Sequence, residues 1–186
     1  MTEALGATPE RQTFRPYDPA WPSKFEAVAA ILRKALPDAK IEHYGSTAVP
    51  GLGGRPILDI QVAVPDAHDR KHYEPALKRL GYARFVPPDL VPLAEAGMIN
   101  YVPADGSNTV HLAVSTLGGF HQVRQLAVRD YLRSSPGEAE AYAEVKKQAA
   151  VAAAGVRQRY GAAKAAFVIA LQERAMAWLE NRRKAG

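Results

Sequence analysis

Hydrophobic positions along the chain change from helical spacing to strand spacing and back again. Between Asp18 and Leu36 apolar residues recur every three or four positions, the spacing of one helix face, and Pro37 cannot continue a helix. The stretches 40–44 and 56–64 are short, the second is rich in Ile and Val, and a Gly/Pro-rich segment separates them. The pattern therefore predicts a helix followed by two strands.

The middle of the chain continues this mixture. Asp105-Gly106 is a turn dipeptide of the kind that joins antiparallel strands, and alternating apolar runs flank it. The elements predicted here are a helix over 67–80, a strand over 82–86, an exposed loop over 87–97, and hairpin strands over 98–102 and 109–115.

Everything after Leu117 is predicted to be helical. The segment 138–154 is alanine-rich, and the segment 157–183 carries a stripe of large apolar residues at helical spacing. We therefore expect an α+β fold, with a small mixed sheet packed by helices and a C-terminal helical half. We expect one domain over residues 14–180, preceded by a disordered tail over residues 1–13.

Composition narrows the classes of function. The chain has no cysteine, which excludes a disulfide framework and any thiolate chemistry. No apolar run approaches the roughly 20 residues needed to cross a bilayer, and the N-terminal residues do not have the pattern of a signal peptide, so we expect a cytoplasmic protein without membrane contact. The net charge is +5, but the 24 basic and 19 acidic residues are mostly interspersed, which favours an anionic small molecule over nucleic acid.

The strongest candidate chemistry lies between residues 41 and 64. A predicted strand ends at Tyr44 and delivers Gly45 and Ser46 to a turn, where small side chains let a phosphate approach backbone N–H groups. Asp59 interrupts the next apolar run, and a carboxylate on a buried strand must be paired, hydrogen-bonded or metal-bound. Two simpler interpretations stay open: Ser46 caps the following turn, and Asp59 pairs with a nearby arginine such as Arg55.

Several of these residues belong to motifs with a family resemblance. GSTAVPGL at 45–52 and RPILDI at 55–60 resemble the GrpB family, a branch of the nucleotidyltransferase superfamily. A second block matches it with RDYLRSSP at 129–136, Tyr142, Lys146, Tyr160 and Lys164. The resemblance spans roughly residues 14–178 and implies a fold like that of the polymerase-β-type nucleotidyltransferases, and a Mg²⁺-dependent transfer of a nucleotidyl group from an NTP to a small acceptor.

The chain departs from the active superfamily pattern on the strand that carries Asp59. That pattern has two acidic residues two positions apart, on one strand face, and a third acid on a later strand. Here the pair is Asp59 and Gln61, and the third position falls on His111. Mg²⁺ prefers hard oxygen ligands, so Asp59 is the candidate metal ligand and the two-metal mechanism is in question. His111 can equally be a hydrogen-bonded core residue.

Basic residues of the helical half are candidates for binding the phosphates. Arg129 and Arg133 are i, i+4 neighbours on one helix face, as are Tyr160 and Lys164, and guanidinium groups suit a polyanion. We assign Arg55, Arg129, Arg133, Tyr160 and Lys164 with Gly45 and Ser46 to substrate binding. An inter-helix salt-bridge network is the alternative for Arg129 and Arg133.

Two functions of different classes follow. The first is a nucleotidyltransferase in which Asp59, Gln61 and His111 form the catalytic set. The second is a catalytically degenerate relative that binds a nucleotide, a coenzyme or another phosphorylated small molecule. A Ser46/His111/Asp59 hydrolase is a remote third possibility, because Ser46 lacks the GxSxG elbow.

Overall fold

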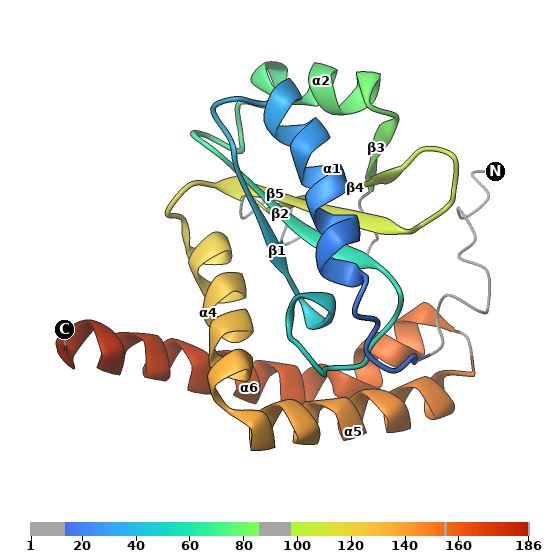
Figure 1. The fold of residues 1–186 in the computed structure, drawn as a ribbon, viewed down its shortest axis with the longest axis vertical. Coiled ribbons are helices and arrows are strands. Elements are labelled where there is room, and N and C mark those ends of the chain that lie inside the picture. Colours follow the sequence, from blue (N-terminus) through green and yellow to red (C-terminus); the bar gives the residue numbers. More distant parts are fainter. Residues whose placement is uncertain (1–13, 86–97, 155, 186) are drawn as a thin grey trace.

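The computed structural model describes residues 14–85, 98–154 and 156–185. Its centre is a five-stranded mixed sheet in the order β1-β2-β5-β4-β3, in which β2 and β5 are parallel and the other neighbours are antiparallel (Figure 1). The strands are β1 Lys40–Tyr44, β2 Leu58–Val64, β3 Tyr82–Phe85, β4 Met98–Pro103 and β5 Val110–Thr116.

Helices surround the sheet and form the whole C-terminal part. They are α1 Trp21–Ala35, η2 Ser46–Ala48, η3 Arg70–His72, α2 Glu74–Arg79, α4 Phe120–Ser134, α5 Pro136–Ala153 and α6 Arg157–Ala185. Figure 1 shows α1 lying across one face of the sheet, with α5 and α6 side by side beneath the strands. The α+β class, the mixed sheet and the helical C-terminal half are confirmed.

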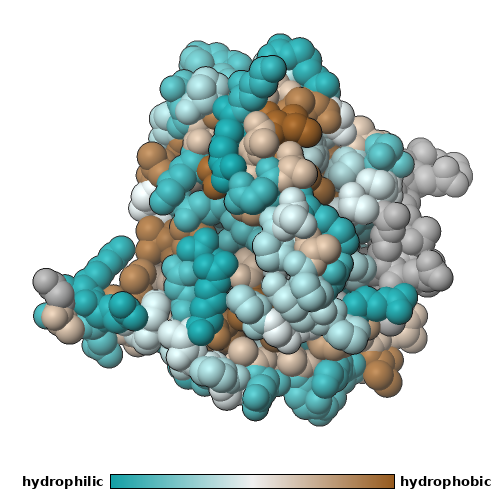
Figure 2. All heavy atoms as spheres, viewed as in Figure 1, coloured by the Kyte–Doolittle hydropathy of each residue, from teal (hydrophilic) through white to brown (hydrophobic). Residues whose placement is uncertain are grey.

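The two faces of the sheet have opposite chemistry, because alternate strand residues point to opposite sides. Ile60, Val62, Leu112 and Val114 are buried on one face in the main core, which also contains apolar residues of α1 and α2. The residues between them in the strands face the other way, toward α4 and the cleft described below, and they are largely polar: Asp59, Gln61, Asn100, His111 and Ser115. The outer surface of the α1 side is mostly hydrophilic, with small separate hydrophobic groups (Figure 2).

One predicted helix is wrong in its extent. Residues 67–80 form the short η3 turn followed by α2, and not one continuous helix. Pro75 explains the break, since inside a longer helix it would lack the N–H for the hydrogen bond to the preceding turn and its ring would clash there. At the second position of α2 it is tolerated.

The helical half has a small core of its own. Leu132 and Leu171 are buried with Val49 and Leu52 from the segment between β1 and β2, and Tyr142 stacks on Phe167 at 5.6 Å between ring centroids. No helix in the described residues is long and apolar enough for a membrane span. The predicted tail at 1–13 and the predicted loop at 87–97 lie outside the described residues.

Candidate functional site

A cleft of about 290 Å³ opens between the polar sheet face and the helical half. Its walls come from the end of β1, the start of β2, β5, α4, α5 and α6. Of the residues predicted for the site, it brings together Gly45, Ser46, Arg55, Asp59, His111, Arg129, Tyr160 and Lys164, whereas Gln61 and Arg133 do not line it.

Gly45 allows the chain to turn tightly against Asp59. Its φ of 70° and ψ of −167° lie in a region that is essentially restricted to glycine. A Cβ at this position would lie 2.4 Å from Oδ2 of Asp59, so any side chain would also displace the carboxylate. The turn then places Ser46 at the start of η2, facing the cleft.

Asp59 and His111 form a pair on the floor of the cleft. They are direct neighbours in the parallel register of β2 and β5, and Nδ1 of His111 lies 3.2 Å from Oδ1 of Asp59. Both side chains remain 28% exposed, so they are accessible to a ligand. With the ring proton on Nδ1, His111 donates to the carboxylate and holds it in place.

Lys146 belongs to the family-matching block, but the sequence analysis did not assign it to the site, and the structure places it in the cleft. Its side chain is only 2% exposed, and Nζ donates hydrogen bonds to Oγ of Ser46, at 2.8 Å, and to the carbonyl oxygen of Gly53. Nζ also lies 4.5 Å from the centre of the Tyr142 ring. The available signal was its position one helical turn after Tyr142 on the buried stripe of α5, where a charge is unexpected.

Burial shifts the proton affinity of this amine. It lowers the pKa of Lys146 to about 7, because the charged form loses hydration. The positive charge of Lys164 lowers the pKa further, Asp59 opposes the shift, and Arg55 adds to it. Near neutral pH the cleft therefore contains a lysine that is charged in only part of the molecules.

Two more cations gather around Tyr160 at the other side of the cleft. The guanidinium of Arg55 lies 5.1 Å and the ammonium of Lys164 lies 5.5 Å from the centre of this ring. Tyr160 itself is 4% exposed, and burial raises the pKa of its hydroxyl. The ring thus holds two positive side chains beside Lys146.

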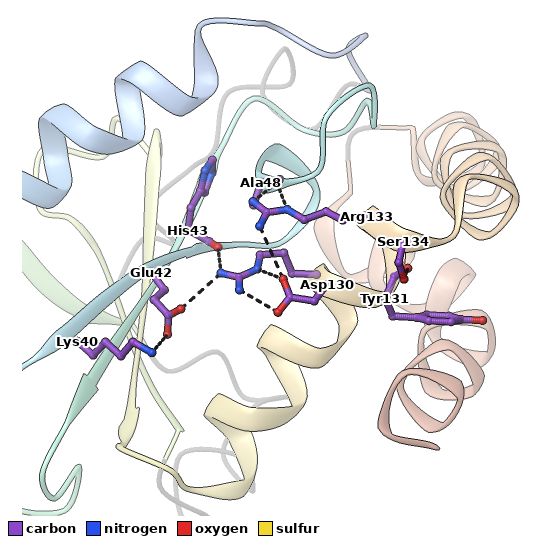
Figure 3. A network of polar contacts seen from close by, with 9 residues as sticks. Lys40, Glu42, His43, Ala48, Asp130, Tyr131, Arg133 and Ser134 are labelled. Carbon is purple, nitrogen blue, oxygen red and sulfur yellow. Dashed lines mark hydrogen bonds and ion pairs between the residues drawn. The ribbon is translucent and has the colours of Figure 1, made fainter. Parts of the chain in front are cut away.

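Arg129 connects α4 to β1, and Arg133 connects α4 to η2; Figure 3 shows Arg133 directed at Ala48. Arg129 binds the carboxylate of Asp130 with Nε and Nη2 at 2.7 and 3.0 Å, and Nη1 donates to the carbonyl oxygen of His43. Arg133 donates twice to the carbonyl oxygen of Ala48, at 3.0 and 2.7 Å. These contacts attach α4 to β1 and η2 through backbone carbonyl groups and not through inter-helix salt bridges, and Arg129 also lines the cleft.

Gln61 lies too deep to share a ligand with Asp59. It is fully buried, and its Nε2 donates to Oγ of Ser115 beneath α4. Although Gln61 and Asp59 occupy the same strand face, the cleft extends only to Asp59.

The donor set is a poor match for Mg²⁺. Among the described residues that line the cleft, Asp59 is the only carboxylate, and one of its oxygens already accepts a hydrogen bond from His111. The described part of the chain contains no group of three His, Asp or Glu side chains that could hold a metal. Mg²⁺ prefers hard oxygen ligands in octahedral geometry, and a neutral imidazole is not a preferred ligand, so Asp59 with His111 beside it is a weaker site than a pair of carboxylates. The described residues of the cleft therefore do not support a metal-dependent reaction step.

Known proteins similar to this chain agree with the family motifs. Residues 12–174 match the family described as GrpB protein. A UPF0157 protein of Pseudomonas aeruginosa is 38% identical over 92% of this chain and 70% of its own length. The crystal structure of the conserved protein GrpB from Enterococcus faecalis superposes with a TM-score of 0.78 at 29% identity, covering 89% of this chain and 98% of that one.

A further relative is a longer protein, and only part of it is similar to this chain. A dephospho-CoA kinase of Mycobacterium leprae is 27% identical over 88% of this chain, but the match covers only 46% of that protein.

Proposed function

We infer that this chain, which belongs to the GrpB family, binds a phosphate-bearing small molecule in the cleft between its sheet and its helical half. The observation that carries the proposal is the charge of the cleft. Arg55, Lys146 and Lys164 converge there, and Asp59 is the only carboxylate that lines the described part of it. Such an excess of positive charge in a partly buried site is stabilised by an anion.

The shape of the turn supports a phosphate as that anion. Gly45 and Ser46 present backbone and a hydroxyl group without bulk, and Lys146 already donates to Ser46. A phosphate group accepts several hydrogen bonds at once, so it can bind the hydroxyl and the ammonium groups together. The cleft volume of about 290 Å³ is at the lower end for small-ligand pockets, which suits a mononucleotide or part of a coenzyme.

Nucleotidyl transfer is the second candidate. The family resemblance implies it, and Gly45, Ser46 and Asp59 do meet at one cleft. The single carboxylate and the buried Gln61 nevertheless support binding better than Mg²⁺-dependent transfer.

A thermal-shift panel tests binding directly. The probes are ATP, the other ribonucleotides, and dephospho-CoA, which the name of the M. leprae relative suggests, each with and without Mg²⁺. A ligand at one hundred times its Kd should stabilise the folded protein by about 2.7 kcal/mol. We expect stabilisation by at least one probe without Mg²⁺, and an affinity about tenfold lower in Lys164→Gln, because one ligand–ammonium contact is lost.

Lys147→Gln is the matched control. Lys147 is next to Lys146 on α5 but its side chain is 55% exposed and it does not line the cleft, so its loss should leave affinity unchanged. Stabilisation by no probe, or equal losses in both variants, would refute the proposed site. Mg²⁺-dependent release of pyrophosphate from an NTP, abolished in Asp59→Asn, would favour transfer over binding.

A further inference from the structure

Lys146 differs from the other basic residues of the cleft because it is buried inside the helical half. No carboxylate of the described residues forms an ion pair with it, and its hydrogen-bond partners are one hydroxyl and one carbonyl group. We propose that Lys146 selects ligands with a doubly charged phosphate group, because it takes up a proton as that group binds. This inference rests on the proposed function, since it concerns the same cleft.

The hydrogen bonds around Nζ accommodate the neutral amine. A neutral amine has two N–H donors and one lone pair, so it can donate to the carbonyl oxygen of Gly53 and accept from the hydroxyl of Ser46. The ammonium form has a third proton, and the Tyr142 ring is the group that faces it. Both protonation states therefore have partners in the same geometry.

Charged and neutral groups from several elements face the ammonium group of Lys146. Lys164 on α6 and Arg55 before β2 disfavour the ammonium form, and among the described residues Asp59 on β2 is the acid that favours it. The other facing groups are neutral side chains, namely Ser46 of η2, Tyr142 of α5 and Phe14 near the N-terminus. An arriving anion would therefore supply the negative charge that the ammonium form lacks.

The coupling has a definite sign. The amine with a pKa of about 7 is mostly neutral at pH 8, and a bound dianion raises that pKa because it attracts the proton. Binding at pH 8 then consumes a proton from solution, and affinity falls as the pH rises. A singly charged phosphodiester attracts the proton less, so it gains less from Lys146.

Isothermal titration in buffers of different ionisation enthalpy measures this proton. The probes are the four ribonucleoside 5′-monophosphates, whose phosphate is doubly charged above about pH 7, and the matching 3′,5′-cyclic monophosphates, which are singly charged diesters. We expect uptake of about 0.9 protons per 5′-monophosphate at pH 8, and a Kd that rises up to about tenfold per pH unit from pH 8 to 9. The cyclic esters should bind more weakly and with less uptake.

Three variants isolate the role of Lys146. Lys146→Met should remove the proton uptake, flatten the pH dependence and reduce the preference for 5′-monophosphates. Lys146→Arg keeps a permanent charge, so it should bind without taking up a proton. Lys147→Met should behave like the wild type, because this exposed neighbour lies outside the cleft.

A stability measurement checks the same titration without any ligand. The folded pKa of Lys146, about 7, lies below the ordinary value of 10.5, so the unfolded chain binds more protons between those values. The free energy of unfolding should therefore rise with pH between about 7 and 10.5. This rise with pH should be absent in Lys146→Met. Below pH 7 the variant should have a higher Tm than the wild type, because it buries no charged amine.

The outcomes separate the two proposals. Binding of a 5′-monophosphate without proton uptake, or unchanged uptake in Lys146→Met, would overturn the assignment of Lys146 and leave the proposed function standing. Failure of every probe to bind would overturn both.

Discussion

A single glycine controls how close Asp59 comes to the main chain. Gly45 has a backbone conformation that other residues avoid, and the carboxylate of Asp59 occupies the space where its side chain would be. The absent side chain of Gly45 therefore has two effects: it permits the backbone turn, and it leaves room for the Asp59 carboxylate on the floor of the cleft.

Gly45→Ala should disrupt the site as well as the fold. Backbone strain of about 1–3 kcal/mol adds to the displacement of Asp59, so we expect a lower Tm and weaker binding of the phosphate-bearing ligand. Gly51→Ala is the matched control: Gly51 also has positive φ, 78°, but a Cβ there meets no atom within 4 Å. It should cost only about 1–2 kcal/mol of stability and leave affinity unchanged. Equal affinity in the two variants would contradict this role of Gly45.

Residue patterns predicted part of both sides of the cleft, including Arg129, Tyr160 and Lys164 on its helical side. Gly45, Ser46, Asp59 and His111 lie on or beside strands, and strand alternation and a Gly-Ser turn are visible in the sequence. Lys146 is different: its place on the apolar stripe of α5 is visible in the sequence, but its partner Ser46 lies one hundred residues away in the chain, so its contact with the cleft could not be predicted.

At the scale of the elements, α4 is held to β1 and η2 by charged side chains that bind backbone carbonyl groups. Arg129 reaches the carbonyl oxygen of His43 at the end of β1, and Arg133 reaches that of Ala48 in η2. Helical spacing predicted that both arginines share one face of a helix. Their target could not be predicted, because phosphate oxygens and carbonyl oxygens accept the same hydrogen bonds.

Arg133→Ala should therefore lower stability without weakening ligand binding. Two hydrogen bonds from a charged group to Ala48 are lost, which we expect to reduce the free energy of unfolding by about 1–2 kcal/mol. Chemical denaturation and ligand titration of the same variant measure the two effects. Arg33→Ala in α1 is the control: its exposed pair with Glu26 should contribute less than about 1 kcal/mol. A large loss of affinity in Arg133→Ala would return Arg133 to the binding site.

At the scale of the whole molecule, a hollow of similar volume lies at each end of β2. The cleft at its start is lined by basic residues, whereas the hollow at its end, also about 290 Å³, is lined by Asp38, Asp66, Asp69 and His72. Charge therefore directs an anion to only one of them. A ligand bound in the cleft would contact both the sheet and the helical half, because these two parts form its opposite walls.

Hydrogen exchange can show which hollow the ligand occupies. A ligand in the cleft should slow exchange in both walls, in the segments 45–57 and 142–164, because opening either wall requires its release. At one hundred times the Kd the slowing should approach about one hundredfold for amides that exchange through this opening. Amides of η3 and α2 beside the acidic hollow are the internal control and should change little. Protection confined to η3 and α2 would place the ligand at the wrong end of β2, and protection of the sheet wall alone would mean that the helical half takes no part in binding.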